Sequence, residues 1–533
     1  MNMASGLSGM LKEGHQSFAG IDEATLKNIT AGTELADIVK SSLGPNGMSK
    51  LVVNHQEKIT VTTDGATIVR ELEVMHPAAK MIVLATEMQE KECGDGTSFV
   101  VAFAGELLKQ SAELLRQGLH TAEVLEGYKR AHEKALEVLP TLVCHTVTDP
   151  RDQKQLEYAI RPTIASKQLG FEDVLAKFVA EAAISVMPPA PRRLSFNVDN
   201  IRVCKLPGGS AGQSHVIRGM VVQRDSETSI KRVENAKVAV FGCGIESSQT
   251  EAKGTVLIRT ADELMNYNKS EEKLMEEMIK GIAEAGTKVI ISQGTISDMA
   301  LHFIGKYEMM AIKIMSKWEL RRLCTAMRCT ALVRLGAPTP EEMGQCDLVE
   351  VQEVGLKKVT VFQQKDEGSR LATLILRAST QSLLNDLERT VDDAIRAVKA
   401  LCSNPEFVPG AGAAEYEIAR QVAELGKAET GLDQYAFKKY AESLEIVPRI
   451  LAETAGHDAT QAMAKLQAAH AEGKAGYGID VEGGSGVSDM AARGVLDLLS
   501  TKKSAMRLAF DAAVTILRVD QIIMSRPAGG KSH

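Results

Sequence analysis

The stretch Gly94-Asp95-Gly96-Thr97-Ser98 separates two segments with helical periodicity. Apolar residues recur at spacings of three and four over 77–92, and a second helix is predicted from Val100 to about Gln117. Thr97 and Ser98 then fall in the first turn of that helix, whose free N–H groups can bind phosphate oxygens. A Mg²⁺ ion would relieve the repulsion between phosphate and the Asp95 carboxylate. An ordinary Asp-Gly turn with Thr97 as a helix cap fits the same five residues, which alone do not decide between the two.

The composition indicates a multidomain globular protein. The chain has 533 residues, of which 44% are hydrophobic, enough for roughly two to four domains. A formal charge of −7 and the lack of a basic stripe argue against nucleic acid as a partner. No apolar run reaches the length of a membrane span, and residues 1–16 lack the apolar core of a signal peptide. We therefore expect a cytoplasmic protein without membrane contact, whose eight cysteines, with no C-x-x-C pair, stay reduced.

Two more glycine breaks occur in the first hundred residues. A helix predicted over 22–43 must end at Gly44-Pro45, because proline has no N–H to donate and restricts the residue before it. The alternating runs 50–53 and 58–62 predict a hairpin, after which Asp64-Gly65 turns the chain into another helix. Three glycine breaks at helix ends, two of them with Asp, suggest a shared binding site for a polyanion.

The middle of the chain has a different character. Strand-like and helical runs alternate from 215 to about 364, which predicts an inserted α/β or α+β domain of roughly 150 residues between helical ends. Pro188, Pro189 and Pro191 mark a hinge or boundary before it. The polar stretch 246–269 is interpreted as a surface protrusion, although a long solvated loop and helix fit equally well.

Several common catalytic motifs are missing. The sequence has no G-x-x-x-x-G-K-[ST], H-E-x-x-H or G-x-S-x-G motif, and Glu415 occupies the third small-residue position of a dinucleotide fingerprint that begins at Gly410. What remain are acids close to glycine turns or in a later helix: Asp64, Asp95, Asp392, Asp393, Asp480 and Asp497. Without a nucleophile or a base histidine, metal-assisted phosphoryl transfer to water is the natural chemistry for such a set.

Six segments together carry a resemblance to chaperonins that covers nearly the whole chain. They are Leu43–Met48, Asp64–Ile68, Gly94–Thr97, Val391–Ala394, Pro409–Gly412 and Gly478–Val481, in the order found in that family. The polar insertion near 246–269 resembles the built-in lid of the group II form. The runs 71–80 and 517–530 look like one particular subunit of the eukaryotic cytosolic chaperonin.

The resemblance implies a multidomain α+β fold. A mainly helical equatorial ATP-binding domain would comprise about 1–150 and 402–533, and an intermediate hinge domain 151–214 and 370–401. An inserted α/β apical domain, 215–369, would bind client proteins and carry a lid protrusion at about 244–275.

The resemblance also implies roles for residues that are far apart in the sequence. Asp95 would hold Mg²⁺, and Asp393 would orient the attacking water with help from Asp64. Because Asp393 is expected in the intermediate domain, closure of that domain would couple to hydrolysis. The implied nucleotide-binding residues are Leu43, Gly44, Pro45, Gly96, Thr97, Ser98, Phe99, Ser166, Lys167, Gly410, Ala411, Gly412, Asp480 and Asp497.

Three positions depart from the family pattern. Ala411 stands where many relatives have Gly, Phe99 replaces a common Thr or Ser, and Leu498 replaces a common Pro. The first two changes are expected to slow nucleotide exchange or hydrolysis in this subunit.

The function implied is that of an ATPase subunit of a molecular chaperone, with ATP and Mg²⁺ as cofactors and K⁺ as an optional further cation. Its partners would be paralogous subunits, in a hetero-oligomeric double ring of eight per ring, and unfolded clients such as actin and tubulin. Two alternatives come from other classes: a small-molecule kinase with Asp393 as base, and a ring scaffold that binds nucleotide without hydrolysing it.

Overall fold

The structure is a computed structural model that describes residues 16–18, 21–189, 195–246, 261–355, 357–364, 370–484 and 486–524. It divides into two compact units, which we call the terminal unit (Met1–Lys177 with Arg389–His533) and the inserted unit (Phe178–Glu388). Helices α8 (Glu172–Val186) and α12 (Gln381–Ser403) cross the division.

The predicted multidomain fold of mixed helix and sheet is confirmed. The finer division into three domains stays a prediction. Part of the predicted lid protrusion at about 244–275, namely 247–260, lies outside the described residues, whereas 261–275 belongs to helix α9 (Ala261–Glu284). The predicted boundary residue Pro191 also lies outside the described residues.

Helices from both ends of the chain build the terminal unit. In the first part they are α2 (Ile21–Lys40), α3 (Gly65–Glu71), α4 (Pro77–Glu92), α5 (Thr97–Arg116), α6 (Thr121–Val138) and α7 (Gln153–Ala165). In the last part they are α13 (Ala413–Ala428), α14 (Asp433–Leu444), α15 (Ile446–Thr454), α16 (Ala459–Ala471), α17 (Met490–Arg493) and α18 (Leu499–Leu517).

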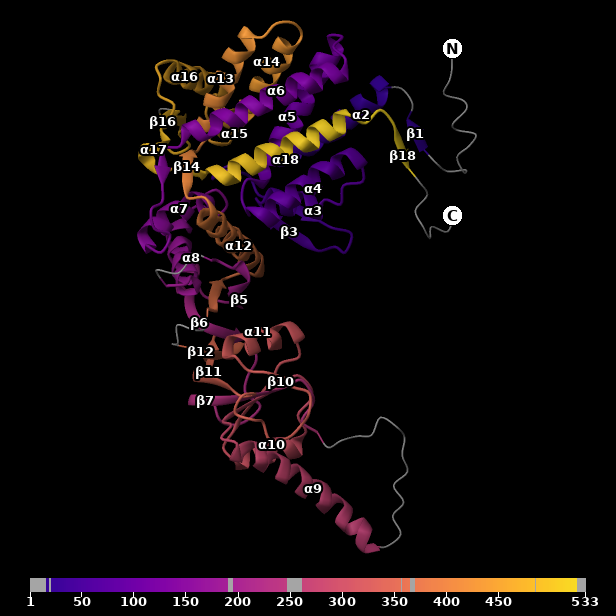
Figure 1. Cartoon of the computed structure of the whole chain (residues 1–533), viewed down its shortest axis with the longest axis vertical. Helices are drawn as coiled ribbons and strands as arrows, with labels where there is room; N and C mark the ends of the chain where they lie inside the picture. The colour runs from indigo at the N-terminus through magenta and orange to yellow at the C-terminus, as the bar shows by residue number, and fades with distance from the viewer. Residues whose placement is uncertain are drawn as a thin grey trace. The chain divides into compact units, whose positions relative to one another are not determined.

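Helix α5 lies in the middle of this core. It packs against α2, α4, α14 and α18, and the helices α2, α4 and α18 can be followed beside it in Figure 1. Val100, Phe103 and Leu107 on α5 are completely buried, as is Met506 on α18. Removing this apolar surface from water is the main force that holds the two ends of the chain in one unit.

The helices of the terminal unit begin in two different ways. Some are capped by a side chain: Asp64 accepts the Thr67 N–H at the start of α3, and His120 forms a capping box with Glu123 at the start of α6. By contrast, α5 follows the left-handed Gly96 and α13 follows the left-handed Gly412, and neither start has a side-chain cap. The N–H groups of these two first turns therefore remain available to another acceptor.

Four small sheets complete the terminal unit. Strands β2 (Lys50–Val53) and β3 (Ile59–Thr62) form the predicted antiparallel hairpin. Strand β1 (Gln16–Phe18) pairs with β18 (Ile522–Met524), and β15 (Tyr477–Ile479) pairs with β16 (Val487–Asp489). The fourth sheet has the order β17 (Leu496–Leu498), β14 (Glu406–Pro409), β4 (His145–Thr146). It brings segments more than 250 residues apart to the same place.

A nine-stranded sheet organises the inserted unit. Its order is β5-β13-β6-β12-β11-β7-β8-β9, and β10 pairs with β7. The strands are β5 (Ile201–Pro207), β6 (His215–Val222), β7 (Arg232–Phe241), β8 (Val289–Ser292), β9 (Met310–Lys313), β10 (Ala331–Leu332), β11 (Gly344–Val354), β12 (Lys357–Gln363) and β13 (Ala372–Ala378). Strands β8 and β9 run parallel to β7, whereas β11 and β12 are antiparallel to their neighbours.

Helices cover both faces of the β7–β9 part of this sheet. Successive side chains of a strand point to opposite faces. Accordingly Val238 and Val240 pack in the cluster of α11 (Lys317–Met327), whereas Ala239 and Phe241 pack in the cluster of α9 (Ala261–Glu284) and α10 (Asp298–Lys306). No helix in the described part of the chain is both long and apolar enough to cross a bilayer.

Candidate functional site

A cavity of about 480 Å³ lies in the terminal unit. Its walls come from the loop after α2, the first turn of α5, the end of α7, the start of α13 and the start of α18. Most of the predicted binding residues line it: Leu43, Gly44, Pro45, Asp95, Gly96, Thr97, Ser98, Phe99, Ser166, Lys167, Ala411, Gly412, Asp480 and Asp497. Gly410, Asp64 and Asp393 are not in the wall, but Lys167 bonds to both of these aspartates.

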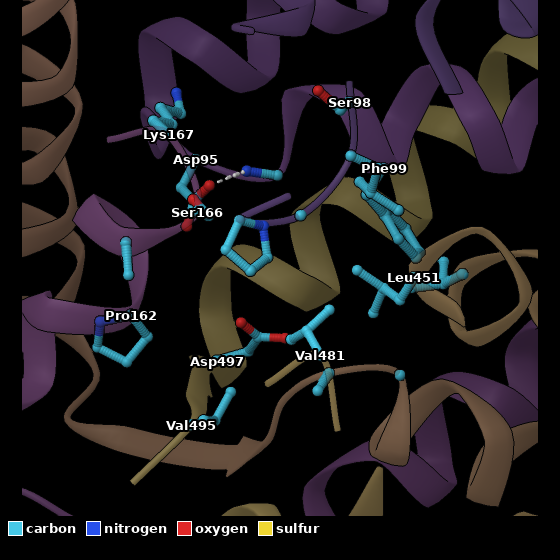
Figure 2. Close-up of a pocket in the computed structure, with 18 of the residues that line it drawn as sticks. Asp95, Ser98, Phe99, Pro162, Ser166, Lys167, Leu451, Val481, Val495 and Asp497 are labelled. Carbon is cyan, nitrogen blue, oxygen red and sulfur yellow. Dashed lines mark hydrogen bonds between the residues drawn. The ribbon is translucent and has the colours of Figure 1, made fainter. Parts of the chain in front are cut away.

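The loop before α5 is held in a fixed geometry. Gly94 and Gly96 both have left-handed φ values, 76° and 79°. The Gly96 N–H donates to Asp95 Oδ1 at 2.7 Å, the bond drawn in Figure 2. Behind the loop, Gln89 Nε2 donates to the Asp95 carbonyl at 2.7 Å and to the Thr501 carbonyl at 3.2 Å. This arrangement presents the uncapped turn that begins at Thr97 to the cavity.

One ammonium group joins two carboxylates at this side of the cavity. Lys167 Nζ donates to Asp64 Oδ1 at 3.2 Å and also to Asp393 Oδ2. These three side chains are almost completely buried, with 10%, 5% and 4% of their surface exposed for Lys167, Asp64 and Asp393. Asp64 also accepts the Thr97 hydroxyl at 3.0 Å, and Arg396 Nη1 donates to Asp393 Oδ1 at 3.3 Å. The predicted catalytic acids are therefore brought together directly behind the first turn of α5.

Burial and charge act in opposite directions on these acids. Burial raises the pKa of Asp393 to about 8 and also raises the pKa of Asp95, although Lys167 favours the ionised form of each. Burial opposes ionisation of Asp64 too, but the charge of Lys167 and hydrogen bonds from Thr67 hold its pKa well below the usual range. For Lys167, the attraction of the three carboxylates outweighs burial and raises its pKa. Three buried carboxyl groups thus interact with one ammonium, and Arg396 is a second cation beside Asp393.

A second buried ammonium lies elsewhere in the cavity wall. Lys502 Nζ bonds to Asp497 Oδ2 at 2.8 Å and to Glu415 Oε1, and it stands 5.1 Å from the centre of the Phe99 ring. The Oε2 atom of Glu415 is buried without a partner in the described structure. Figure 2 shows Asp497 well separated from Lys167, so the two ammonium groups serve different parts of the cavity.

The loop that follows β15 supplies Asp480. Its carboxylate accepts the N–H groups of Glu482 and Gly483, at 3.2 and 2.9 Å, and bonds to Arg493 Nη1 at 2.6 Å. Burial opposes ionisation, but these bonds and the charge of Arg493 lower the Asp480 pKa. Asp480 therefore fixes the shape of its own loop.

The sequence did not identify Lys502, Glu415, Gln89 or Arg493 as members of the site. Glu415 was considered only as a departure from a dinucleotide fingerprint. Lys502 lies in the first turn of the last long helix, α18, which begins at Leu499. A usable signal existed for Lys502, since it follows Asp497 by five residues across a helix start, whereas its partner Glu415 lies 87 residues away.

Comparison with known proteins identifies the family. The model of the TCP-1/cpn60 chaperonin family matches residues 35–527. T-complex protein 1 subunit theta of Homo sapiens is 49% identical over 528 residues, which cover 99% of this chain and 96% of the relative. The protein of that name from Dictyostelium discoideum is 46% identical over 98% of this chain and 97% of its own length, and that of Arabidopsis thaliana 48% identical over 98% and 95%.

These matches confirm the resemblance to group II chaperonins, and within them to the theta subunit of the eukaryotic cytosolic chaperonin. They extend over nearly the full length of each relative, so the similarity is not limited to one domain. The chain belongs to the TCP-1/cpn60 chaperonin family.

Proposed function

We propose that this chain is an ATP-hydrolysing subunit of a hetero-oligomeric, cytosolic chaperonin that encloses unfolded proteins. The observation that carries the proposal is the buried bridge from Lys167 to Asp64 and Asp393, next to the uncapped first turn of α5. The name of the relatives, subunit theta of T-complex protein 1, supports assembly with other kinds of subunit. The double ring, its eight-fold rings and clients such as actin and tubulin belong to the same proposal.

The cavity fits a magnesium–nucleotide complex. Its volume of about 480 Å³ lies within the usual range for small-molecule sites. Two glycines in its wall, Gly44 and Gly412, have left-handed φ values, 86° and 80°. A Cβ atom at either position would come within 2.8 Å of a neighbouring side chain, so the backbone could not approach in this way with another residue.

The two ends of the cavity suit different parts of the nucleotide. The turn Gly96–Ser98 would donate N–H groups to phosphate oxygens, and the Asp95 carboxylate, a hard oxygen ligand, would hold Mg²⁺. When bound, that ion would neutralise charge on the phosphates and on the crowded carboxylates. Asp497, whose partner Lys502 stands 5.1 Å from the centre of the Phe99 ring, would face the nucleoside, and K⁺ would add to the charge balance.

The activation of water is assigned to Asp393, which lies behind the cavity wall and bonds to Lys167 in that wall. Its pKa of about 8, raised by burial, is close to the working pH, as a general base requires. Lys167 and Arg396 hold one carboxylate oxygen each and thereby fix the orientation of the group. Asp64 would balance the charge of Lys167 when Asp393 accepts a proton. Coupling of this step to closure of a hinge domain remains part of the proposal.

Client binding is assigned to the inserted unit. Three large apolar side chains in and around α11 are exposed to solvent. Met315, just before the helix, is 64% exposed, Trp318 in its first turn 68%, and Val333, which follows β10, 84%. Exposed apolar surface of this kind is typical of sites that bind other proteins. An unfolded chain, which exposes its own apolar side chains, is a suitable ligand.

The test compares two acids that are adjacent on α12. Asp393→Ala should keep ATP binding but lower single-turnover phosphate release by about 10²–10⁴-fold. Asp392→Ala, which removes the same charge from the half-buried neighbouring residue, should stay close to the unaltered chain. Asp95→Ala should instead weaken the binding of Mg-ATP, measured by calorimetry.

Other outcomes would select the alternatives. If the unaltered subunit binds ATP without releasing phosphate, alone and in the assembled particle, it is a scaffold. If a metabolite stimulates ATP consumption and is itself phosphorylated, the chain is a kinase. Equal hydrolysis by the Asp393→Ala and Asp392→Ala variants would refute the role of Asp393.

A further inference from the structure

Helix α11 in the inserted unit ends with two cysteines in a defined backbone motif. Arg328, the residue after the helix, has φ 55° and ψ 41°, in the left-handed region. The Cys329 N–H then donates to the Cys324 carbonyl at 3.0 Å. A left-handed residue at the helix end, followed by a residue whose N–H bonds to the carbonyl five positions earlier, defines the Schellman motif. In this motif the side chains of the two bonded residues lie in contact. Apolar residues usually occupy these two positions, but in this chain both are cysteine.

The two thiols interact directly. Each thiol is the largest influence on the other through a side-chain hydrogen bond. That bond lowers the pKa of Cys324, against the effect of burial, and together with burial it raises the pKa of Cys329. The first proton is therefore lost from Cys324, whose thiolate is stabilised by the Cys329 S–H group.

The surroundings favour reaction between the two thiols. Both side chains are half-buried at the margin of the core between α11 and the sheet, so a small reagent can reach them. Cys329 is held on its other side by β11, since a Cβ atom on Gly344 would lie 3.0 Å from Cys329 Cβ. Among the described residues, no group of three or more metal-ligating side chains occurs, so the pair lacks the ligands of a structural zinc site.

We propose that Cys324 and Cys329 form a reversible dithiol–disulfide site that reacts with low-molecular-weight disulfides such as oxidised glutathione. The Cys324 thiolate attacks one sulfur of the reagent, forms a mixed disulfide and releases one glutathione thiolate. That thiolate takes up the proton of Cys329, whose sulfur then attacks Cys324 and releases the second glutathione, which is protonated by solvent. Two protein thiols are oxidised to one disulfide, and one glutathione disulfide is reduced to two thiols.

The second step should be fast because the backbone has already closed the loop. The bond from Cys329 N–H to the Cys324 carbonyl fixes the six residues that the disulfide would enclose. Little further conformational entropy is lost when the two sulfur atoms join. At equilibrium the amount of the intramolecular disulfide should therefore exceed that of the mixed disulfide.

Trypsin provides a direct test, because it cleaves after Arg322, Arg328 and Arg334 and so places the cysteines on separate peptides. The full-length chain is equilibrated with mixtures of reduced and oxidised glutathione, alkylated, digested and analysed by mass spectrometry. We expect the peptides 323–328 and 329–334 to be recovered as a disulfide-linked pair that disappears on reduction. Digesting a mixture of isotopically labelled and unlabelled chains shows whether the link is formed within one chain, as the proposal requires.

Three variants serve as controls. Cys329→Ser should stop at a glutathione adduct on Cys324, and Cys324→Ser should stop at a glutathione adduct on Cys329, neither with a disulfide link between the two positions. Arg328→Gly keeps the left-handed turn but removes one tryptic site, so both cysteines remain on peptide 323–334, which should carry an internal disulfide and resist alkylation until it is reduced. Separate glutathione adducts on both cysteines without a linked pair, or links only between different chains, would overturn the proposal.

Discussion

The charge balance of the site predicts the consequence of removing Lys167. Lys167→Met leaves Asp64 and Asp393 buried without their common counter-charge, in a cluster where three carboxyl groups already share one ammonium. Asp393 keeps its ion pair with Arg396, but Asp64 loses the ammonium that pairs with it. Loss of one partner of a buried ion pair costs about 3–5 kcal/mol, because the remaining charge is neither solvated nor paired. We expect the free energy of unfolding of the terminal unit to fall by about that amount.

An exposed ion pair gives the matched control. Lys40 Nζ lies 2.6 Å from Asp37 Oδ1, but 43% and 57% of these side chains are exposed. Lys40→Met removes the same atoms and the same charge, yet should cost less than about 1 kcal/mol because water screens the pair. Guanidinium unfolding followed by circular dichroism, with hydrogen exchange of α5 and α12 to localise the effect, measures both changes.

The double variant Lys167→Met with Asp393→Asn tests the cause. If the cost comes from an unpaired charge, neutralising Asp393 should restore about 1–3 kcal/mol of what Lys167→Met lost, and the two changes will not be additive. The reasoning fails if Lys167→Met costs no more than Lys40→Met. It also fails if the double variant loses the sum of the two single losses.

Three further predictions concern other buried groups of the terminal unit. Lys502→Met leaves its two carboxylate partners unpaired in the cavity wall and should weaken ATP binding about tenfold by calorimetry; unchanged affinity would contradict this. Ala411 has φ 53°, so Ala411→Gly should raise the unfolding free energy by up to about 1 kcal/mol, whereas Ala419→Gly inside α13 should lower it by about 1 kcal/mol; equal signs would refute the strain. Burial beside Tyr440 lowers the pKa of His132 from 6.5 to about 4. The neutral imidazole therefore stabilises the fold fully above pH 6.5, and about 3 kcal/mol of unfolding free energy should be lost as the pH falls to 4. Unfolding measured at a series of pH values should show this loss, and His132→Gln should abolish it.

Local sequence patterns were sufficient for the helices and turns of the first hundred residues. The helix predicted over 77–92 has the observed bounds of α4, and the predicted hairpin is β2–β3. These elements depend on periodicity and on Gly and Pro, which act within a few residues. Strands β9 and β11 were not predicted, because β9 has only four residues and the acidic β11 is stabilised by pairing with both β7 and β12. Such pairing is not visible in a short window of sequence.

The residues of the site could be predicted better than the ion pairs and hydrogen bonds between them. The resemblance supplied Asp64, Asp393 and Lys167, but not that one ammonium joins both acids across 103 and 226 residues of chain. Lys502 and Glu415 were not predicted as site residues because only their burial beside each other distinguishes them from other charged residues. A charged side chain in a sequence is usually solvated, and only the fold shows which few are not.

The glycines of the phosphate turn serve packing as well as backbone geometry. A Cβ atom on Gly94 would lie 2.9 Å from the Asp393 carbonyl and 2.7 Å from Arg396 Cβ, so no larger residue allows α12 to approach the loop this closely. A Cβ atom on Gly65 would similarly meet the Ser98 backbone at 2.9 Å, which brings the start of α3 against the start of α5. The contacts that place Asp393 and Asp64 behind the α5 turn therefore depend on these glycines. The same glycines that the turn geometry requires therefore also allow the start of α3, the start of α5 and helix α12 to pack together beside one cavity.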